Sequence, residues 1–197
     1  MTLRRIAVTG GPGAGKTSVW RELASTCDPR LLAVPEVATA LFQHVFPTVQ
    51  STAERCAVQR AIFSVQQNLE AIHDARRAPG QVLLCDRGVP DGAGYWPDGP
   101  AAFFATMGVD WSHEVLRYDA VLFLETAAAG GFSISPGNAV RTESLEAAVR
   151  VDLQLREVWA RHPRIVFVAH EREFSVKVAR GMSVLAGWLK ELAQDNP

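Results

Sequence analysis

The sequence predicts an α/β fold in which helices cover both faces of a five-stranded parallel sheet. Short apolar runs of strand length alternate with longer segments whose apolar residues recur at helical spacing. This alternation is typical of parallel sheets, because parallel strands need a helical crossover between them. A glycine-rich turn joins the first apolar run to the first helical segment. These observations predict a three-layer domain with its ligand beyond the carboxyl ends of the strands.

The strands are expected where short apolar runs are bounded by polar or turn-forming residues. Pro35 follows the second run and ends it. Between Gln81 and Asp86 the third run is continuously apolar, which is the pattern of a strand buried on both faces of its sheet. In chain order, we expect strands at residues 5–9, 31–34, 81–86, 120–124 and 165–169.

The helices are expected in the intervals between these strands. Ser51 or Thr52 can cap a long helix whose apolar positions, such as Ile62 and Leu69, recur at helical spacing. Pro47 ends the helix before it. In chain order, we expect helices at residues 16–25, 39–45, 51–77, 101–107, 112–116, 142–162 and 174–192.

Two stretches rich in glycine and proline interrupt this order. Residues 88–101 are predicted to form a substrate loop, because their glycines and polar residues argue against a core element. Residues 127–141 are predicted to form a lid over the site. No internal repeat or linker divides the sequence, so we expect a single nucleotide-binding domain over residues 1–197.

The composition excludes several classes of protein. Apolar residues make up 48% of the chain and the formal net charge is −1, whereas proteins that bind nucleic acids are usually basic. The three cysteines are odd in number and widely spaced, which favours reduced core residues over disulfides or a zinc site. No apolar run suits a signal peptide or a membrane span, so we expect a cytoplasmic protein without a membrane partner. A homodimer stays open as a quaternary state.

The glycine-rich turn carries the pattern G-x-x-x-x-G-K-[ST], with Gly10, Gly15, Lys16 and Thr17 in the fixed places. Backbone N–H groups of such a loop bind phosphates at a helix N-terminus. The lysine reaches the β- and γ-phosphates, and the threonine hydroxyl holds Mg²⁺. The pattern therefore predicts ATP and Mg²⁺ as ligands; the alternative is a turn that only begins a helix. The residues expected to contact the nucleotide are Gly11, Pro12, Gly13, Ala14, Gly15, Lys16, Thr17 and Ser18.

Two charged residues end the third predicted strand. Asp86 has the position of the carboxylate that holds Mg²⁺ beside a phosphate loop, directly or through water. Its alternative is an ordinary loop aspartate. Arg87 is predicted to clamp a phosphate or to orient an acceptor hydroxyl; its alternative is a pair with a surface carboxylate.

Further catalytic candidates follow the second strand and the lid. Glu36 is predicted to accept the proton of an attacking hydroxyl or to help hold the metal. Its alternative is a helix-start glutamate that the helix dipole stabilises. Arg141 ends the predicted lid and is expected to close over the transferring phosphates. Arg150 and Arg156 fit solvated or paired side chains better.

The acceptor is expected to bind near the residues that follow Asp86. Asp91 could bind a hydroxyl, and Tyr95 or Trp96 could stack on a base or sugar; core or lid packing is the equal alternative. The predicted acceptor site comprises Glu36, Gln66, Arg87, Asp91 and Tyr95. Amides that could read a base lie on the long helix, with exposed surface positions as their alternative: Gln59, Gln66 and Gln67.

The order of these motifs resembles that of nucleoside and nucleotide kinases. The phosphate loop, Pro35-Glu36, the long glutamine-bearing helix, Asp86-Arg87 and the Arg141 lid occur in the same order in the deoxynucleoside, thymidylate and ribosylnicotinamide kinases. The resemblance implies the strand order 2-3-1-4-5, Glu36 as general base and an acidic-Arg pair at Asp86-Arg87. The sequence is most similar to small bacterial proteins described as AAA-domain ATPases, which share residues 9–13 and the segment from Asp86 to Tyr95.

These residues favour a kinase for a small-molecule acceptor over three other functions. A motor or remodelling ATPase usually carries glutamate after the strand aspartate, where this sequence has Arg87. A regulatory GTPase needs an N-K-x-D guanine reader, and neither Lys177 nor Lys190 lies in one. A nucleotide-binding module without turnover stays open as an alternative.

Overall fold

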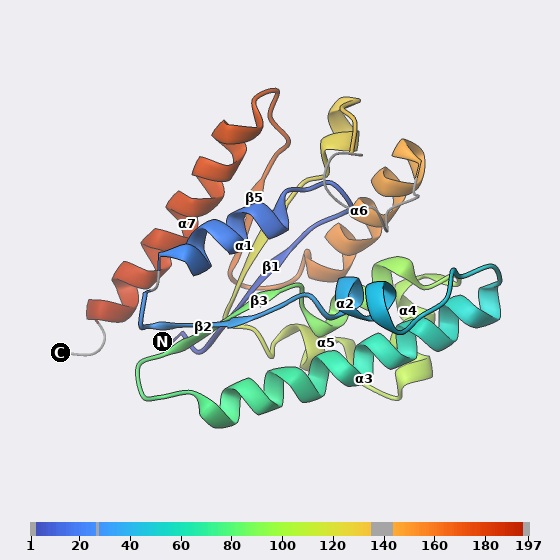
Figure 1. Ribbon diagram of the computed structural model, residues 1–197, viewed down its shortest axis with the longest axis horizontal. Coiled ribbons are helices and arrows are strands. Elements are labelled where there is room, and N and C mark those ends of the chain that lie inside the picture. Colours follow the sequence, from blue (N-terminus) through green and yellow to red (C-terminus); the bar gives the residue numbers. More distant parts are fainter. Residues whose placement is uncertain (1–2, 27, 135–143, 195–197) are drawn as a thin grey trace.

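The computed structural model describes residues 3–26, 28–134 and 144–194 (Figure 1). Five parallel strands form one sheet in the order β2-β3-β1-β4-β5, which confirms the predicted fold class and strand order. The strands are β1 (Arg5–Thr9), β2 (Leu31–Val34), β3 (Val82–Asp86), β4 (Ala120–Leu124) and β5 (Ile165–Val168).

Helices connect and cover the strands. The α-helices are α1 (Lys16–Ser25), α2 (Val37–His44), α3 (Thr52–Arg76), α4 (Gly99–Met107), α5 (Trp111–Val115), α6 (Leu145–Trp159) and α7 (Phe174–Gln194). Two short 3₁₀ helices, η1 (Val89–Tyr95) and η2 (Ala127–Gly130), follow β3 and β4. The predicted helices are all present, and their predicted bounds lie within three residues of those observed.

The sheet separates two apolar cores because successive side chains of a strand point to opposite faces. On β1, Ile6 and Val8 belong to the core under α1 and α7, whereas Ala7 belongs to the core under α3, η1, α4 and α6. Figure 1 shows α1 and α7 on one side of the sheet and α3 on the other. All residues of β3 and β4 are buried, as expected for central parallel strands.

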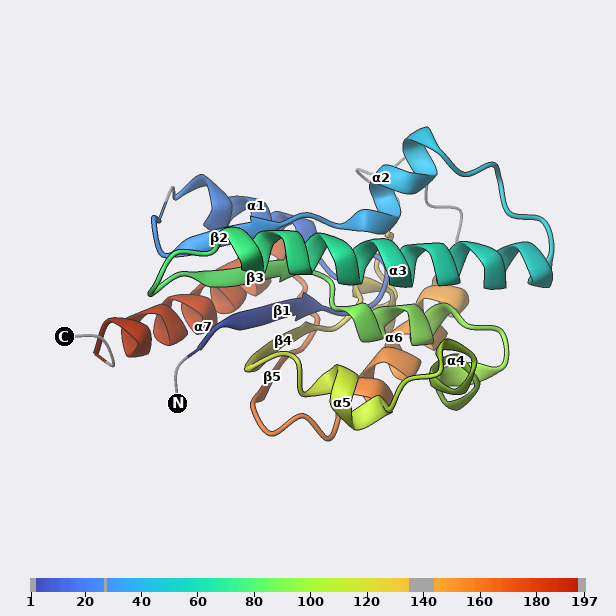
Figure 2. The same cartoon turned by 90° about the horizontal axis from the view of Figure 1, so that it is seen from below.

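The register of the sheet brings the ends of three strands together. Val8 of β1 is paired with Asp86 of β3, and Val34 of β2 is paired with Cys85. The residues that follow β1, β2 and β3 therefore lie at the same edge of the sheet. Figure 2 shows α3 alongside β2 and β3, with its first turns extending beyond this edge.

The long helix α3 begins as its sequence predicts. The Ser51 side chain accepts a hydrogen bond from the Glu54 N–H, and the Glu54 carboxylate accepts one from the Ser51 N–H. This capping box satisfies backbone donors that would otherwise lack partners at a helix start. It determines where α3 begins.

The prediction that residues 88–101 form a loop outside the core is wrong. Most of this stretch forms η1 and the start of α4, and η1 is buried against α6, α4 and α3. Its glycines permit close packing: a Cβ at Gly92 would lie 2.9 Å from the Phe103 ring, and a Cβ at Gly94 would lie 2.7 Å from Leu155. The prediction was wrong because it took glycine as a sign of an exposed loop, whereas these glycines let neighbouring side chains pack closely against the backbone.

The cysteine prediction holds for the residues described. Cys56 is half-buried and Cys85 is fully buried, and both are free thiols. Burial raises the pKa of the Cys85 thiol well above its ordinary value, which keeps it protonated. Cys27 lies outside the described residues.

Candidate functional site

The phosphate loop connects β1 to α1 at the edge where the strand ends meet. Gly15 adopts a left-handed conformation with φ 88°, and α1 begins at the next residue, Lys16. The Lys16 Nζ donates hydrogen bonds to the carbonyl oxygens of Gly10 and Gly11, at 2.7 and 2.8 Å. The loop thus forms a compact turn at a helix N-terminus, with the ammonium group folded over it. This geometry is that of an anion site.

A buried aspartate that the sequence prediction missed braces this loop. Asp152 of α6 accepts hydrogen bonds through Oδ1 from the N–H of Gly11 at 2.8 Å and from the N–H of Thr126 at 2.9 Å. The Thr126 hydroxyl donates to the carbonyl of Pro12. The sequence did offer one indication of a buried role for Asp152: it lies on the otherwise apolar face of α6, beside Val151.

Asp86 lies at the end of β3 with its side chain almost fully buried. Its Oδ1 has no hydrogen-bond partner among the described residues. Burial raises the pKa of this carboxyl and the Glu36 charge raises it further, against Arg87 and Lys16, so that it stands at about 6. A buried oxygen without a donor is costly in an apolar site, but it suits a group that binds a cation.

Glu36 forms an ion pair with Arg87 across the ends of β2 and β3. The Arg87 Nε donates to Glu36 Oε1, and the Thr39 hydroxyl donates to Glu36 Oε2 at 2.7 Å. Burial would raise the pKa of Glu36, but the charges of Arg87 and Lys16 and these hydrogen bonds bring it to about 2. Glu36 is therefore ionised at neutral pH. The sequence prediction missed Thr39, which follows Glu36 by one helical turn.

Arg87 is held in an unusual conformation for a residue with a side chain. Its φ is 77°, in the left-handed region. Its Nη1 lies 3.6 Å from Asp91 Oδ2, and its guanidinium carbon lies 5.7 Å from the centre of the Tyr95 ring. Arg87 thus pairs with buried carboxylates of the site, and not with a surface carboxylate. Local strain of this kind is most often retained at functional sites.

Asp91 is held in place by hydrogen bonds from β1 and α6. Its carboxylate accepts hydrogen bonds from the Thr9 hydroxyl at 2.8 Å and from the Trp159 indole N–H at 2.9 Å. Burial raises the pKa of Asp91, while Arg87 and these donors oppose that rise. Asp91 is thereby fixed in place, where it holds Arg87 against the end of β1.

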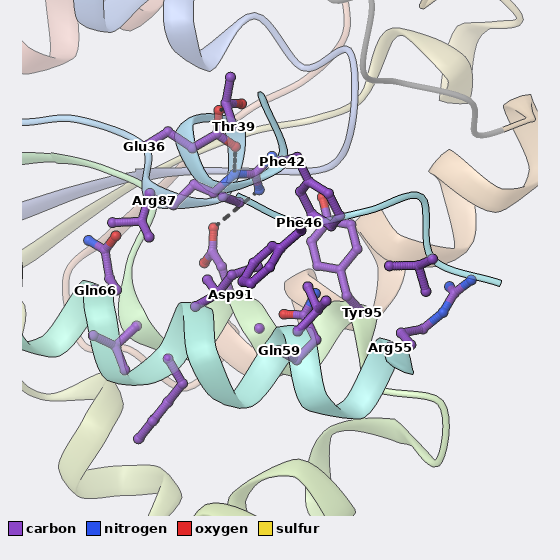
Figure 3. Close-up of a pocket in the computed structure, with 18 of the residues that line it drawn as sticks. Glu36, Thr39, Phe42, Phe46, Arg55, Gln59, Gln66, Arg87, Asp91 and Tyr95 are labelled. Atoms are coloured by element: carbon purple, nitrogen blue, oxygen red, sulfur yellow. Dashed lines mark hydrogen bonds and ion pairs between the residues drawn. The ribbon is translucent and has the colours of Figure 1, made fainter. Parts of the chain in front are cut away.

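A cavity of about 410 Å³ opens beside this ion-pair cluster, between α2, α3 and η1. Figure 3 shows Glu36, Arg87 and Asp91 along one part of its wall, with the rings of Phe42, Phe46 and Tyr95 beyond them. All five predicted acceptor residues line it: Glu36, Gln66, Arg87, Asp91 and Tyr95. Pro12 of the phosphate loop also lines the cavity, so the two sites adjoin.

The lid prediction is only partly covered by the structure. Arg141 lies outside the described residues. Before that gap, Ile134 is buried and packs against the phosphate loop, since a Cβ at Gly13 would lie 2.4 Å from it. Arg156 pairs with Glu125, as expected.

The residues at this edge fit Mg²⁺ bound together with phosphates. The partnerless Oδ1 of Asp86 and the hydroxyl of Thr17, the first-turn threonine of α1, are hard oxygen donors. In the described part of the chain, no cluster of three or more His, Cys, Asp or Glu side chains could hold a metal ion alone. Mg²⁺ in nucleotide sites is commonly held by one or two carboxylates together with phosphate oxygens.

Comparison with known proteins places the chain in a family. A family model described as AAA domain matches residues 5–173, which is most of the chain. The comparison with curated proteins found no match. Within the described residues, none of the helices has both the length and the apolar character needed to cross a membrane. On the family match, the parallel sheet and the phosphate loop, this chain belongs to the AAA domain family and is a nucleotide-binding P-loop protein.

Proposed function

We propose that this protein is a kinase that transfers the γ-phosphoryl group of ATP to a hydroxyl of a small, nucleoside-like acceptor. The observation that carries this proposal is the acceptor-sized cavity beside the phosphate loop, with the Glu36–Arg87 ion pair in its wall. A hydrolase needs room there for one water molecule, about 30 Å³ of liquid volume. The cavity of about 410 Å³ is far larger and has aromatic walls, which suits an organic acceptor.

The phosphate loop holds the donor in this proposal. Its N–H groups and the Lys16 ammonium bind the β- and γ-phosphates, once Lys16 leaves the carbonyls of Gly10 and Gly11. Mg²⁺ bound at Asp86 and Thr17 would supply further positive charge against the phosphates. Phosphoryl transfer needs mainly positioning and charge stabilisation of this kind.

Glu36 and Arg87 position the acceptor. The Glu36 carboxylate accepts a hydrogen bond from the acceptor hydroxyl, and Arg87 keeps the carboxylate directed at the cavity. The acceptor oxygen forms a bond to the γ-phosphorus as the bond to the β,γ-bridging oxygen breaks. The hydroxyl proton passes through Glu36 to solvent, and ADP leaves. A pKa of about 2 makes Glu36 a weak base, so its contribution is chiefly orientation.

The experiment combines labelled ATP with a panel of nucleosides, nucleotides and sugars. We expect label to appear on an acceptor, and Glu36→Gln to slow that transfer on the order of 100-fold while ATP binding persists. Lys16→Ala should abolish both transfer and hydrolysis. The matched control, Glu157→Gln on the exposed face of α6, should leave transfer unchanged.

Two results would count against this proposal. ADP release that is independent of every acceptor would identify an ATPase instead. Unchanged transfer in the Glu36→Gln variant would remove Glu36 from the reaction.

A further inference from the structure

Two buried carboxamides line the same wall of the acceptor cavity. Gln59 and Gln66 are 7% and 4% exposed, and both belong to α3. Their separation of two helical turns places them on one face of the helix. Figure 3 shows Gln66 at the end near Arg87 and Gln59 near Tyr95. Buried amides are normally hydrogen-bonded, so the partners of these two decide what the cavity can recognise.

Glu70, one turn beyond Gln66, accepts a hydrogen bond from the amide N–H of Gln66. The Gln66 Nε2 donates to Glu70 Oε1 at 2.9 Å. The Gln66 Oε1 diverges from this nitrogen across the planar amide, and Gln66 lines the cavity. Gln59 also lines the cavity and is 7% exposed, but no carboxylate lies one turn further along α3 from it, where Phe63 stands. The hydrogen bond to Glu70 therefore holds Gln66 in one orientation.

The protons around Glu70 are ordered so that this orientation cannot reverse. The Val89 N–H donates to the Tyr118 hydroxyl at 2.8 Å, which leaves that hydroxyl to donate to Glu70 Oε1 at 2.6 Å. Arg5 and Arg117 face Glu70 Oε2 at 3.3 and 3.7 Å, and an arginine can only donate. Burial raises the pKa of Glu70, and these donors oppose the rise. Glu70 Oε1 thus accepts from both Gln66 and Tyr118, while Oε2 faces the two guanidinium groups without a hydrogen-bond partner among the described residues.

We propose that Glu70 is a specificity-determining residue: it fixes the Gln66 amide so that the cavity offers a carbonyl oxygen and selects an acceptor with a hydroxyl or N–H donor at that point. The ligand class is a nucleoside whose sugar hydroxyl or base amino group meets Gln66. Glu70 acts through Gln66 and does not itself touch the ligand. This inference rests on the acceptor cavity of the proposed function.

The test measures nucleoside binding by calorimetry without ATP. The nucleoside that binds best among adenosine, guanosine, cytidine and uridine is compared with analogues that each lack one donor, such as the 2′-deoxy, 3′-deoxy and deamino forms. In the natural protein, loss of the donor that meets Gln66 should weaken binding roughly tenfold. In Gln66→Met, the same loss should change affinity less than about twofold. Gln67→Met, the matched control outside the cavity, should retain the tenfold difference.

Glu70→Gln tests the orientation itself. The introduced amide should turn its oxygen to Arg5 and Arg117 and its nitrogen to Gln66, so that Gln66 turns over. The donor-bearing nucleoside should then bind no better than its donor-free analogue. If this variant fails to fold, Gln66→Met carries the test, since methionine keeps the length of the side chain.

Each outcome is decisive. The inference is overturned if removing the hydrogen-bond donor from the nucleoside weakens binding equally in the natural protein and in Gln66→Met. It is also overturned if no nucleoside binds. Phosphoryl transfer to nucleosides that does not depend on any hydrogen-bond donor of the nucleoside overturns this inference but supports the kinase proposal. Binding that shows the donor dependence without phosphoryl transfer keeps this inference and removes the kinase.

Discussion

Asp86 is a buried carboxylate that its surroundings do not satisfy. Its Oδ1 has no partner among the described residues, and burial together with the Glu36 charge raises its pKa to about 6. The folded protein therefore holds a proton on Asp86 more tightly than the unfolded chain, whose ordinary value is 3.8. Stability from this group is complete below about pH 4 and is lost as the pH rises through about 6.

We expect Asp86→Asn to raise the free energy of unfolding at pH 7 in metal-free buffer. A shift from 3.8 to about 6 corresponds to about 3 kcal/mol, and the gain should vanish near pH 4. Urea unfolding at both pH values measures it, with the exposed Asp98→Asn as control. A lower free energy of unfolding for Asp86→Asn at pH 7 would contradict the conclusion that the site disfavours an ionised Asp86. In the same variant, adding Mg²⁺ should no longer increase the affinity for ATP. This result is expected if Asp86 is retained for function at a cost in stability.

At the scale of elements, η1 depends on glycine for its place in the core. The segment fits between α4 and α6 because Gly92 and Gly94 let the Phe103 and Leu155 side chains approach its backbone. Asp91 and Tyr95 belong to the same short helix. Packing of η1 therefore determines where the acceptor residues lie.

Gly94→Ala should destabilise the protein by about 1–3 kcal/mol, because the new methyl group would lie 2.7 Å from Leu155 in a filled core. Gly187→Ala in α7 is the matched control. No atom lies within 4 Å of a Cβ there, so better helix propensity should stabilise the protein by up to about 1 kcal/mol. Thermal unfolding distinguishes the two. Equal effects of the two substitutions would show that η1 tolerates a side chain and is loosely packed.

At the scale of the whole molecule, Asp152 connects α6 to both the phosphate loop and the end of β4. Two backbone donors, Gly11 and Thr126, share its Oδ1. Nearby, Lys177 of α7 donates to the carbonyl of Glu125, and burial lowers its pKa to about 8. The phosphate loop, α6, α7 and the end of β4 thus meet here, although their residues are far apart in the sequence.

Asp152→Ala should lower ATP affinity roughly tenfold and destabilise the protein by about 1–3 kcal/mol, because the N–H groups of Gly11 and Thr126 lose their acceptor. Asp152→Asn keeps the oxygen and should have a much smaller effect. Nucleotide titration and urea unfolding provide the two readouts. If alanine and asparagine behaved alike, the charge of Asp152 and not its accepting oxygen would be the important property.

Much of the phosphate end of the site could be predicted, because it depends on local chain geometry and on strand direction. The phosphate-loop pattern of glycines between a strand and a helix specifies one backbone conformation. Parallel strands then bring Glu36 and Asp86 to the edge of the sheet where β1 ends. The acceptor end could be predicted only in part. Gln59, Gln66 and Gln67 are all candidates from the sequence, but only the packing of α2 and α3 decides that Gln59 and Gln66 line the cavity together with Phe42.

The sequence by itself determined the order of elements, the α/β class and the phosphate loop, since each follows from hydrophobic period or from backbone freedom within a few residues. Only the tertiary structure decided that η1 lies in the core, that Glu36 pairs with Arg87, and that Asp152 of α6 accepts hydrogen bonds from the phosphate loop and from the end of β4. The physical reason is that a buried polar group must find its partner in three dimensions, and that partner is set by the packing of helices on the sheet.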